Sequence, residues 1–257
     1  MPLKLMYITN SEDVAHIAEE AGVDRIFVDM EYIGKTDRQG GMDTVQSRHT
    51  ADDVRRLAQC LNKAELFVRV NPIHEKTDKY SSSKEEIDEV IEAGADLLML
   101  PYFKTAEEVQ TFVKYVNGRA KTVLLVETPE AAAIAEDLVQ IPGIDEMFIG
   151  LNDLSLGYGK NFMFELLLDG TVEELCLKFR KGGIPYGFGG IASLGKGMLP
   201  SEYVIKEHYR LGSTCAILSR SFCRTDQVTD LKEIQKIFET ELPKIRELEE
   251  ECRVHSE

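Results

Sequence analysis

Short apolar runs alternate along the chain with segments of helical periodicity. Eight of the runs are bounded by turn residues and predict buried strands at residues 3–8, 25–28, 66–70, 96–100, 122–126, 146–149, 184–188 and 215–218. The segments between them carry apolar residues at helical spacing, and capping residues such as Ser11 and Thr50 stand at their starts. Eight strands that alternate with helices predict an α/β fold, a single (β/α)8 TIM barrel over residues 1–257. An open doubly wound sheet is the alternative.

Two connections and the tail depart from this regular alternation. Residues 34–49 and 71–82 form long polar segments, and connections of this length usually carry function. Residues 161–179 are predicted to be helical with a break at Asp169-Gly170. Residues 225–257 are predicted to form a helical C-terminal extension, helical over 229–250 and divided at Pro243, because proline removes a helical hydrogen bond.

Composition and charge limit the partners and the cellular compartment that we expect for this protein. The chain has 257 residues, 43% of them hydrophobic, and a formal net charge of −15. This charge opposes binding to nucleic acid or to an anionic membrane. The five cysteines show no C-x-x-C spacing and are expected to be reduced thiols. No signal peptide and no apolar span of about 18 residues is present, so we expect a soluble cytoplasmic protein without nucleic-acid or membrane partners.

Two of the predicted strands end at a single carboxylate. Glu127 follows the run 122–126, and Asp153 lies just beyond the run 146–149, one strand–helix–strand unit later. The carboxyl ends of barrel strands meet at one mouth, so these carboxylates are expected to converge there. A cap or an ion pair would explain either one alone, but two uncompensated buried carboxylates are costly. Two oxygen donors suit Mg²⁺ or Mn²⁺ better than zinc.

Five strand-end motifs occur together in a familiar order. They are Val28-Asp29-Met30-Glu31, Val68-Arg69-Val70-Asn71-Pro72, Ala93-Gly94-Ala95-Asp96-Leu97-Leu98-Met99-Leu100-Pro101, Val126-Glu127-Thr128-Pro129 and Ile149-Gly150-Leu151-Asn152-Asp153-Leu154-Ser155. In this succession the chain resembles the HpcH/HpaI aldolase and citrate lyase β-chain family, over about residues 3–222. The resemblance implies a metal-dependent homo-oligomeric barrel that acts on pyruvate-like 2-oxo acids.

The resemblance also assigns roles to residues of this chain. It implies Glu127 and Asp153 as ligands of Mg²⁺ or Mn²⁺, and Arg69 as the catalytic group that holds the oxygen of bound pyruvate. The backbone amides around Asn152 and Asp153 would receive the substrate carboxylate, and Glu31 is a further substrate-binding candidate. The implied reaction makes or breaks a C–C bond through a metal-bound pyruvate enolate, with an aldehyde as the second substrate. A divalent cation and a guanidinium are suited to stabilise the enolate oxygen.

One half of the family's site departs from its pattern. The aldolase branch has a histidine after the acidic residue of the second strand, where this chain has Tyr32. The aspartate that pairs with this histidine is replaced within Ser81-Ser82-Ser83. His49 and His74, in the long loops, are the available substitutes, and a surface or capping role is the alternative for each. Our hypothesis is that His49 restores proton transfer.

Two other functions are compatible with the same sequence features. An acyl-CoA lyase of the malyl-CoA or citryl-CoA type is the closest rival, and a non-catalytic barrel that binds a 2-oxo acid as a regulatory or structural subunit is another.

Residues 187–192 fit a G-x-G-x-x-A dinucleotide pattern, but they follow a seventh strand, and Pro200 argues against a helix directly after them. We predict instead that the glycine-rich stretch 182–197 forms a flexible loop after the seventh strand.

Overall fold

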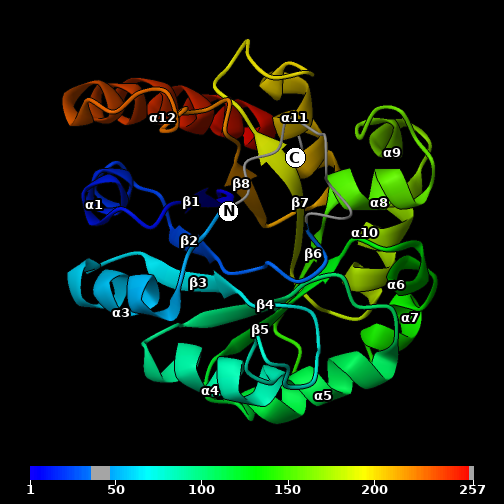
Figure 1. The fold of residues 1–257 in the computed structure, drawn as a ribbon. Coiled ribbons are helices and arrows are strands. Elements are labelled where there is room, and N and C mark those ends of the chain that lie inside the picture. Colours follow the sequence, from blue (N-terminus) through cyan, green and yellow to red (C-terminus); the bar gives the residue numbers. More distant parts are fainter. Residues whose placement is uncertain (36–46, 255–257) are drawn as a thin grey trace.

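Eight parallel strands form a closed barrel, so the predicted (β/α)8 fold is confirmed (Figure 1). The computed structural model describes residues 1–35 and 47–254. Residues 36–46 of the long loop predicted over 34–49 lie outside the described part. Each strand pairs with its neighbours in chain order, and β8 pairs with β1. The strands are β1 Lys4–Ile8, β2 Arg25–Asp29, β3 Glu65–Arg69, β4 Leu97–Leu100, β5 Lys121–Val126, β6 Glu146–Ile149, β7 Tyr186–Ile191 and β8 Cys215–Leu218.

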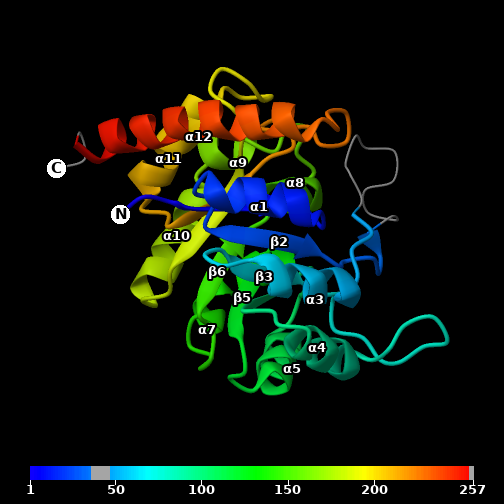
Figure 2. The ribbon, with the colours of Figure 1, turned by 90° about the vertical axis from the view of Figure 1, so that its left-hand side faces the viewer.

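Helices surround the barrel on its outer face (Figures 1 and 2). Four of the larger ones begin at a serine or threonine whose side chain accepts a backbone N–H of the first turn, as predicted for Ser11 and Thr50. The helices are α1 Glu12–Glu20, α3 Ala51–Cys60, α4 Ser83–Glu92, α5 Ala106–Val116, α6 Pro129–Ala133, α7 Ala135–Leu138, α8 Leu151–Gly157, α9 Glu165–Leu168, α10 Thr171–Lys181, α11 Ser201–Leu211 and α12 Leu231–Val254.

The predicted division of the C-terminal helix is wrong, and two other helical segments differ from a regular alternation. The C-terminal helix α12 is continuous, and Pro243 lies inside it. Phe238, Leu242 and Ile245 on both sides of the proline are buried against the body of the protein, so packing outweighs the local cost of the proline. Residues 129–138 form two short helices, α6 and α7. Helix α8, which the sequence did not reveal, begins directly after β6. The predicted break at Asp169-Gly170 is present and separates α9 from α10.

The seventh strand, predicted at 184–188, extends further into the glycine-rich segment, because β7 runs to Ile191. Gly187 lies so close to β8 that a Cβ there would overlap the backbone carbonyl of Cys215. Glycine therefore permits the close strand contact that closes the barrel. No helix opens directly on these glycines, because α11 begins only at Ser201. The dinucleotide pattern thus lacks the helix N-terminus that it needs to bind a pyrophosphate.

Inward-facing side chains fill the barrel in layers. Successive residues of a strand face opposite sides, so β2 and β3 each present every second residue to the interior. In register, Arg25 stands opposite Glu65 at the bottom, Phe27 opposite Phe67 in the middle, and Asp29 opposite Arg69 at the top. The two phenylalanine rings stack with their centroids 4.8 Å apart. Polar groups thus occupy both ends of a dry interior.

The bottom layer is closed by a buried ion pair. Arg25 donates two hydrogen bonds to Glu146, at 2.8 and 2.9 Å, and a third from Nε to Glu65 at 3.0 Å. Cys215 Sγ adds a contact to Glu146 at 3.1 Å. Arg25 is 1% exposed, so its charge depends on these carboxylates.

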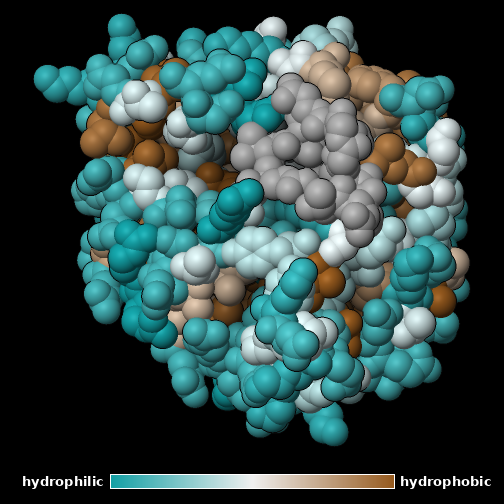
Figure 3. All heavy atoms as spheres, in the orientation of Figure 1, coloured by the Kyte–Doolittle hydropathy of each residue, from teal (hydrophilic) through white to brown (hydrophobic). Residues whose placement is uncertain are grey.

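The outer surface carries most of the charge. Figure 3 shows a largely hydrophilic face in the orientation of Figure 1, with small apolar areas scattered over it. A separate apolar core lies between the barrel and its helices. Over residues 1–35 and 47–254, no helix is both long enough and apolar enough to cross a membrane.

Candidate active site

Two pockets open at the carboxyl ends of the strands. The larger, of about 440 Å³, is lined from the ends of β8, β1, β2 and β3, and includes Asp29, Lys35, His49, Arg69 and Arg220. The smaller, of about 220 Å³, is lined from β4, β5 and β6, and includes Tyr102, Glu127 and Asp153. The mouth is therefore divided into a mixed-charge half and a carboxylate half. This is the end of the barrel where catalytic groups of such folds lie.

Arg69 is held by Asp29 at the boundary between the two halves. Nε of Arg69 donates to Oδ1 of Asp29 at 2.9 Å, and Nη2 donates to Oδ2 at 2.7 Å. The guanidinium also lies over the ring of Phe27, with Cζ 5.5 Å from its centroid. Burial alone would raise the pKa of Asp29, but Arg69 and Lys35 outweigh burial and hold it well below its usual value. Asp29 is thus an ionised anchor for the arginine.

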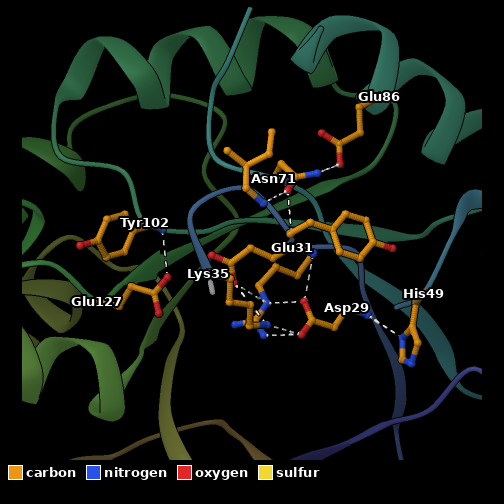
Figure 4. Close-up of polar contacts among 11 residues, drawn as sticks. Asp29, Glu31, Lys35, His49, Asn71, Glu86, Tyr102 and Glu127 are labelled. Atoms are coloured by element: carbon orange, nitrogen blue, oxygen red, sulfur yellow. Dashed lines mark hydrogen bonds and ion pairs between the residues drawn. The ribbon is translucent and has the colours of Figure 1, made fainter. Parts of the chain in front are cut away.

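Lys35 joins this cluster from the loop after β2 (Figure 4). Its Nζ lies 2.6 Å from Oδ2 of Asp29 and 3.5 Å from Oε2 of Glu31. Its side chain is only 6% exposed, and it lines the larger pocket. Glu31, predicted as a substrate-binding residue, is buried and lies 3.6 Å from Nε of Arg69. Two carboxylates and two cations therefore form one buried cluster on the pocket floor.

Glu127 and Asp153 are both buried and line the same small pocket. Oε1 of Glu127 accepts the backbone N–H of Tyr102 at 3.0 Å (Figure 4). Tyr102 has a φ of 46°, a conformation that costs energy for a residue with a side chain and is concentrated at functional sites. The segment just after β4 thus orients Glu127 through the backbone amide of Tyr102, a residue in a strained conformation.

Glu127 and Asp153 offer oxygen donors of the kind that Mg²⁺ and Mn²⁺ prefer. They line the same pocket of about 220 Å³. Burial alone would lower the pKa of Arg69, but Asp29, Glu31 and, to a smaller extent, Glu127 raise it. The residues therefore fit a divalent cation that completes its coordination with water and substrate. Among the described residues, the one group of three metal-binding side chains within 4.8 Å is elsewhere, at His16, Glu19 and Glu20 on α1.

Asn152 and Asp153 fall in the first turn of α8, which begins at Leu151. The first amides of a helix have no acceptor within the helix, so they suit a carboxylate. Asp153 is buried, whereas Asn152 is partly exposed. The role that the sequence gives to these amides remains a prediction.

His49 lies beside Asp29 in the larger pocket. Its Nδ1 accepts the backbone N–H of Asp29 at 3.0 Å (Figure 4). This nitrogen therefore carries no proton in the described geometry, and Nε2 carries the proton of the neutral ring. Burial lowers the pKa of His49 below its ordinary value, although Asp29 and Asp53 oppose this effect. The ring is placed to donate from Nε2, and a second proton on Nδ1 would break the bond to Asp29.

His74, the other substitute considered from the sequence, fastens its own loop. Its Nδ1 lies 2.7 Å from the carbonyl oxygen of Pro72, and its Nε2 lies 2.7 Å from that of Ser81. The ring does not line either pocket at the mouth. The structure brings Glu31, His49 and Arg69 together, and Glu127 with Asp153, but leaves His74 apart.

A chain of hydrogen bonds that the sequence did not reveal supports the segment after β2 that carries Glu31 and Lys35. Oδ1 of Asn71 accepts the backbone N–H groups of Tyr32 and Ile33, at 2.8 and 2.9 Å. Nδ2 of Asn71 donates to Oε1 of Glu86 at 2.9 Å (Figure 4). Asn71 belongs to one of the five strand-end motifs. Its position just after a strand end is the one feature of the sequence that could have indicated a role at the site. Lys35 had no such signal, because it lies inside a polar loop.

Solved structures with the same fold cover nearly the whole chain. An HpcH/HpaI aldolase from Desulfitobacterium hafniense DCB-2 superposes with a TM-score of 0.65 at 15% identity, over 91% of this chain and 93% of that chain. An HpcH/HpaI aldolase/citrate lyase family protein from Burkholderia cenocepacia J2315 gives 0.66 at 17%, over 91% and 95%. The citrate synthase SbnG gives 0.62 at 15%, over 91% and 94%. At these identities the likeness shows the fold.

Sequence comparison identifies the family directly. None of the curated proteins matches the chain. A model of the HpcH/HpaI aldolase/citrate lyase family matches residues 4–167, which is more than half of the sequence and includes every strand end from β1 to β6. The protein therefore belongs to the HpcH/HpaI aldolase/citrate lyase family, whose members are aldolases and lyases.

Proposed function

We propose that the protein is a divalent-metal-dependent lyase that makes or breaks the C–C bond between a pyruvate unit and an aldehyde, through the enolate of pyruvate. The observation that carries the proposal is the position of Arg69. It lines the mixed-charge pocket, is held there by Asp29, and is near enough to Glu127 to interact with it electrostatically. A guanidinium fixed between an acceptor pocket and two carboxylates is suited to a developing enolate oxygen.

Each side chain contributes a separate part of the chemistry. The described hydrogen bonds of Arg69 use Nε and Nη2, so Nη1 is the donor that we assign to the 2-oxo oxygen. Glu127 and Asp153 would hold Mg²⁺ or Mn²⁺, which supplies Lewis-acid stabilisation of negative charge when bound. The amides of Asn152 and Asp153 would receive the substrate carboxylate. Glu31 lies 3.5 Å from Lys35 and 3.6 Å from Arg69, and it would hold both cations in position for the substrate.

The first test is ligand binding. Mn²⁺ together with oxalate, which imitates the pyruvate enolate, is expected to raise the melting temperature by several degrees, because a ligand of the native state stabilises it. Glu127→Gln and Asp153→Asn should abolish the shift. Glu130→Gln is the matched control, because Glu130 lies on the same segment with its side chain 51% exposed and paired with Lys104. No shift at millimolar concentrations in the unmodified protein would support the non-catalytic alternative.

The second test is turnover. Cleavage of 4-hydroxy-2-oxo acids should release pyruvate, stop on addition of a chelator and return with Mg²⁺ or Mn²⁺. Arg69→Lys keeps the charge but loses the two-bond geometry with Asp29, and we expect a loss of 100-fold or more in kcat/KM. Malyl-CoA and citryl-CoA belong in the same panel. Turnover of these thioesters without turnover of the hydroxy acids would favour the acyl-CoA lyase alternative.

A further inference from the structure

Lys35 is the buried cation of the site that the proposed chemistry does not yet use. Its Nζ contacts Oδ2 of Asp29 at 2.6 Å, and Nη2 of Arg69 contacts the same oxygen at 2.7 Å. The ammonium and the guanidinium therefore lie one hydrogen-bond length from a single atom. Lys35 and Arg69 both line the mixed-charge pocket, which extends to the ends of β1 and β8, whereas Glu127 and Asp153 line the smaller pocket. Lys35 is thus placed beside the space for the second substrate.

The backbone that carries Lys35 is fixed on several sides. The amide of Lys35 donates to the carbonyl of Tyr32 at 3.3 Å, which closes a four-residue turn. Gly34, in this turn, has a φ of 74°, which glycine adopts without strain. Asn71 holds the amides of Tyr32 and Ile33. Asp29 and Glu31 then fix Nζ itself (Figure 4). This is the support that a proton-transfer group needs in order to act at one position.

We propose that Lys35 is the acid and base that moves the proton of the aldehyde-derived oxygen. The inference rests on the proposed function and identifies the missing proton-transfer half of that site. The position that holds a histidine in the family's aldolase branch is Tyr32 in this chain. Tyr32 does not line the mixed-charge pocket, and burial, followed by the charge of Asp29, raises its pKa to about 12. Lys35 supplies the function three residues later.

The proposed step is balanced in atoms and electrons. In the direction of synthesis, C3 of the enolate attacks the aldehyde carbon, the C3–C4 bond forms, and the electron pair of the carbonyl moves to its oxygen. The ammonium of Lys35 gives this oxygen a proton and becomes a neutral amine. In cleavage, the amine takes the proton of the C4 hydroxyl, and the electron pair of the C3–C4 bond passes to the enolate. The ammonium then loses this proton to water, and C3 of the enolate takes a proton from water, which yields pyruvate.

Four other titratable side chains of the pocket, those of Asp29, His49, Tyr7 and Cys223, are less suited to this step. Nδ1 of His49 is occupied by the amide of Asp29, so the ring cannot take up a proton without losing that bond. Asp29 is bound by both Arg69 and Lys35. The hydroxyl of Tyr7 donates to the carbonyl of Cys223 at 3.0 Å, and burial raises the pKa of both side chains. Lys35 alone among these combines fixed position, buried charge and exchangeable protons.

Two reactions of the metal-loaded protein separate Lys35 from the rest of the site. Decarboxylation of oxaloacetate produces the same enolate without any hydroxyl proton to move, so it depends on Arg69 and the cation but not on a group at C4. Lys35→Met should therefore retain decarboxylation within a few-fold of the unmodified protein. It should lose cleavage of 4-hydroxy-2-oxo acids by 100-fold or more, the range that acid–base catalysis contributes.

Lys35→Arg is the matched variant. Arginine keeps the positive charge between Asp29 and Glu31 but does not give up its proton. If Lys35 transfers a proton, this variant decarboxylates oxaloacetate and still fails to cleave. If the lysine only braces Asp29 and Arg69, arginine restores cleavage and the proposal is overturned. Lys63→Met, at an exposed lysine that pairs with Glu20, should leave both reactions unchanged.

Two further outcomes distinguish this inference from the proposed function. If the unmodified protein catalyses neither reaction and does not bind Mn²⁺ with oxalate, the proposed function itself fails. If cleavage survives in Lys35→Met, the function stands and the inference about Lys35 is overturned. Borohydride reduction in the presence of pyruvate should leave the mass of the protein unchanged. A pyruvate adduct on Lys35 would instead make it a Schiff-base nucleophile and would also overturn the inference.

Discussion

Gly150 lies directly against the side chain of Glu127. A Cβ atom at position 150 would come within 2.8 Å of Cβ of Glu127 and within 2.9 Å of its Oε2. The cause is the register of β5 and β6, in which Leu125 stands opposite Phe148, so that Glu127 and Gly150 are the next inward-facing pair. The glycine provides the space that the carboxylate occupies.

Gly150→Ala should therefore displace Glu127 and weaken the proposed cation site. The φ of Gly150 is −84°, so alanine adds no backbone strain, and the effect arises from contact alone. We expect the dissociation constant of Mn²⁺, measured by calorimetry, to rise 10-fold or more. The melting temperature without cation should fall by only a few degrees. Unchanged Mn²⁺ affinity would show that Glu127 is not a ligand.

The two roles considered for His49 predict different activities for the variants His49→Gln and His49→Ala. If the neutral ring only accepts the amide of Asp29 and donates from Nε2, then His49→Gln should retain most turnover, because its side-chain oxygen and nitrogen can repeat both bonds. His49→Ala should lose about 10-fold, since it leaves the Asp29 amide unpaired. Should both variants lose 100-fold or more, with a changed pH profile, His49 transfers a proton after all. Near-normal turnover of His49→Ala across the pH range would remove it from the site.

Arg25 should be required for stability and not for binding. Arg25→Met leaves the buried Glu146 without its ion-pair partner, whereas Glu65 keeps Lys121, and breaking a buried ion pair in this way typically costs about 3–5 kcal/mol. Urea unfolding should show this loss in the free energy of unfolding. Arg55→Met is the control, because the side chain of Arg55 is 48% exposed, and it should change stability by about 0.5 kcal/mol or less. A loss below about 1 kcal/mol for Arg25→Met would contradict the expectation.

His208 should make the protein sensitive to mild acid. The ring is fully buried, stacks on Phe188 at 3.9 Å, and has Nδ1 2.7 Å from Oγ of Ser213. Burial lowers its pKa from 6.5 to about 3. Between these two values the unfolded chain binds a proton that the folded protein does not. Folding stability should therefore fall as the pH drops below about 6.5, by up to about 1.4 kcal/mol per pH unit.

The measurement is urea unfolding between pH 4 and pH 7. His208→Phe keeps the stack on Phe188 and removes the titrating group, so its stability should depend less steeply on pH than that of the unmodified protein. Parallel curves for the two proteins would exclude His208 as the source of the acid sensitivity.

The barrel and half of the site followed from local patterns in the sequence. Apolar runs between turn residues located all eight strands, because a strand buried on both faces has few polar positions. The carboxyl ends of the strands then identified Arg69, Glu127 and Asp153. These predictions needed only the rule that parallel strands end at one edge, so no side-chain contact had to be known.

The rest depended on tertiary contacts. The sequence did not mark Lys35, because a lysine in a polar loop usually faces solvent, whereas here Asp29 and Glu31 draw it inward. It also did not reveal that Nδ1 of His49 is occupied. Pro243 suggested a break in α12 that packing overrides. Strand β7 was placed two residues early, because its glycines resemble a loop until β8 is seen to need the space.

Helix α12 bonds back to the start of the chain. Glu249 accepts the amide of Leu3 at 2.7 Å, and Arg246 binds the carbonyl of Leu3 at 2.8 Å and Asp24 at 3.1 Å. The strand that follows Leu3, β1, has one edge that only β8 can pair. During synthesis on the ribosome, this edge therefore stays open until residues 215–218 and α12 have emerged. The first strand to be made is the last to be closed, and a nascent chain stalled before β8 should need a chaperone to stay soluble.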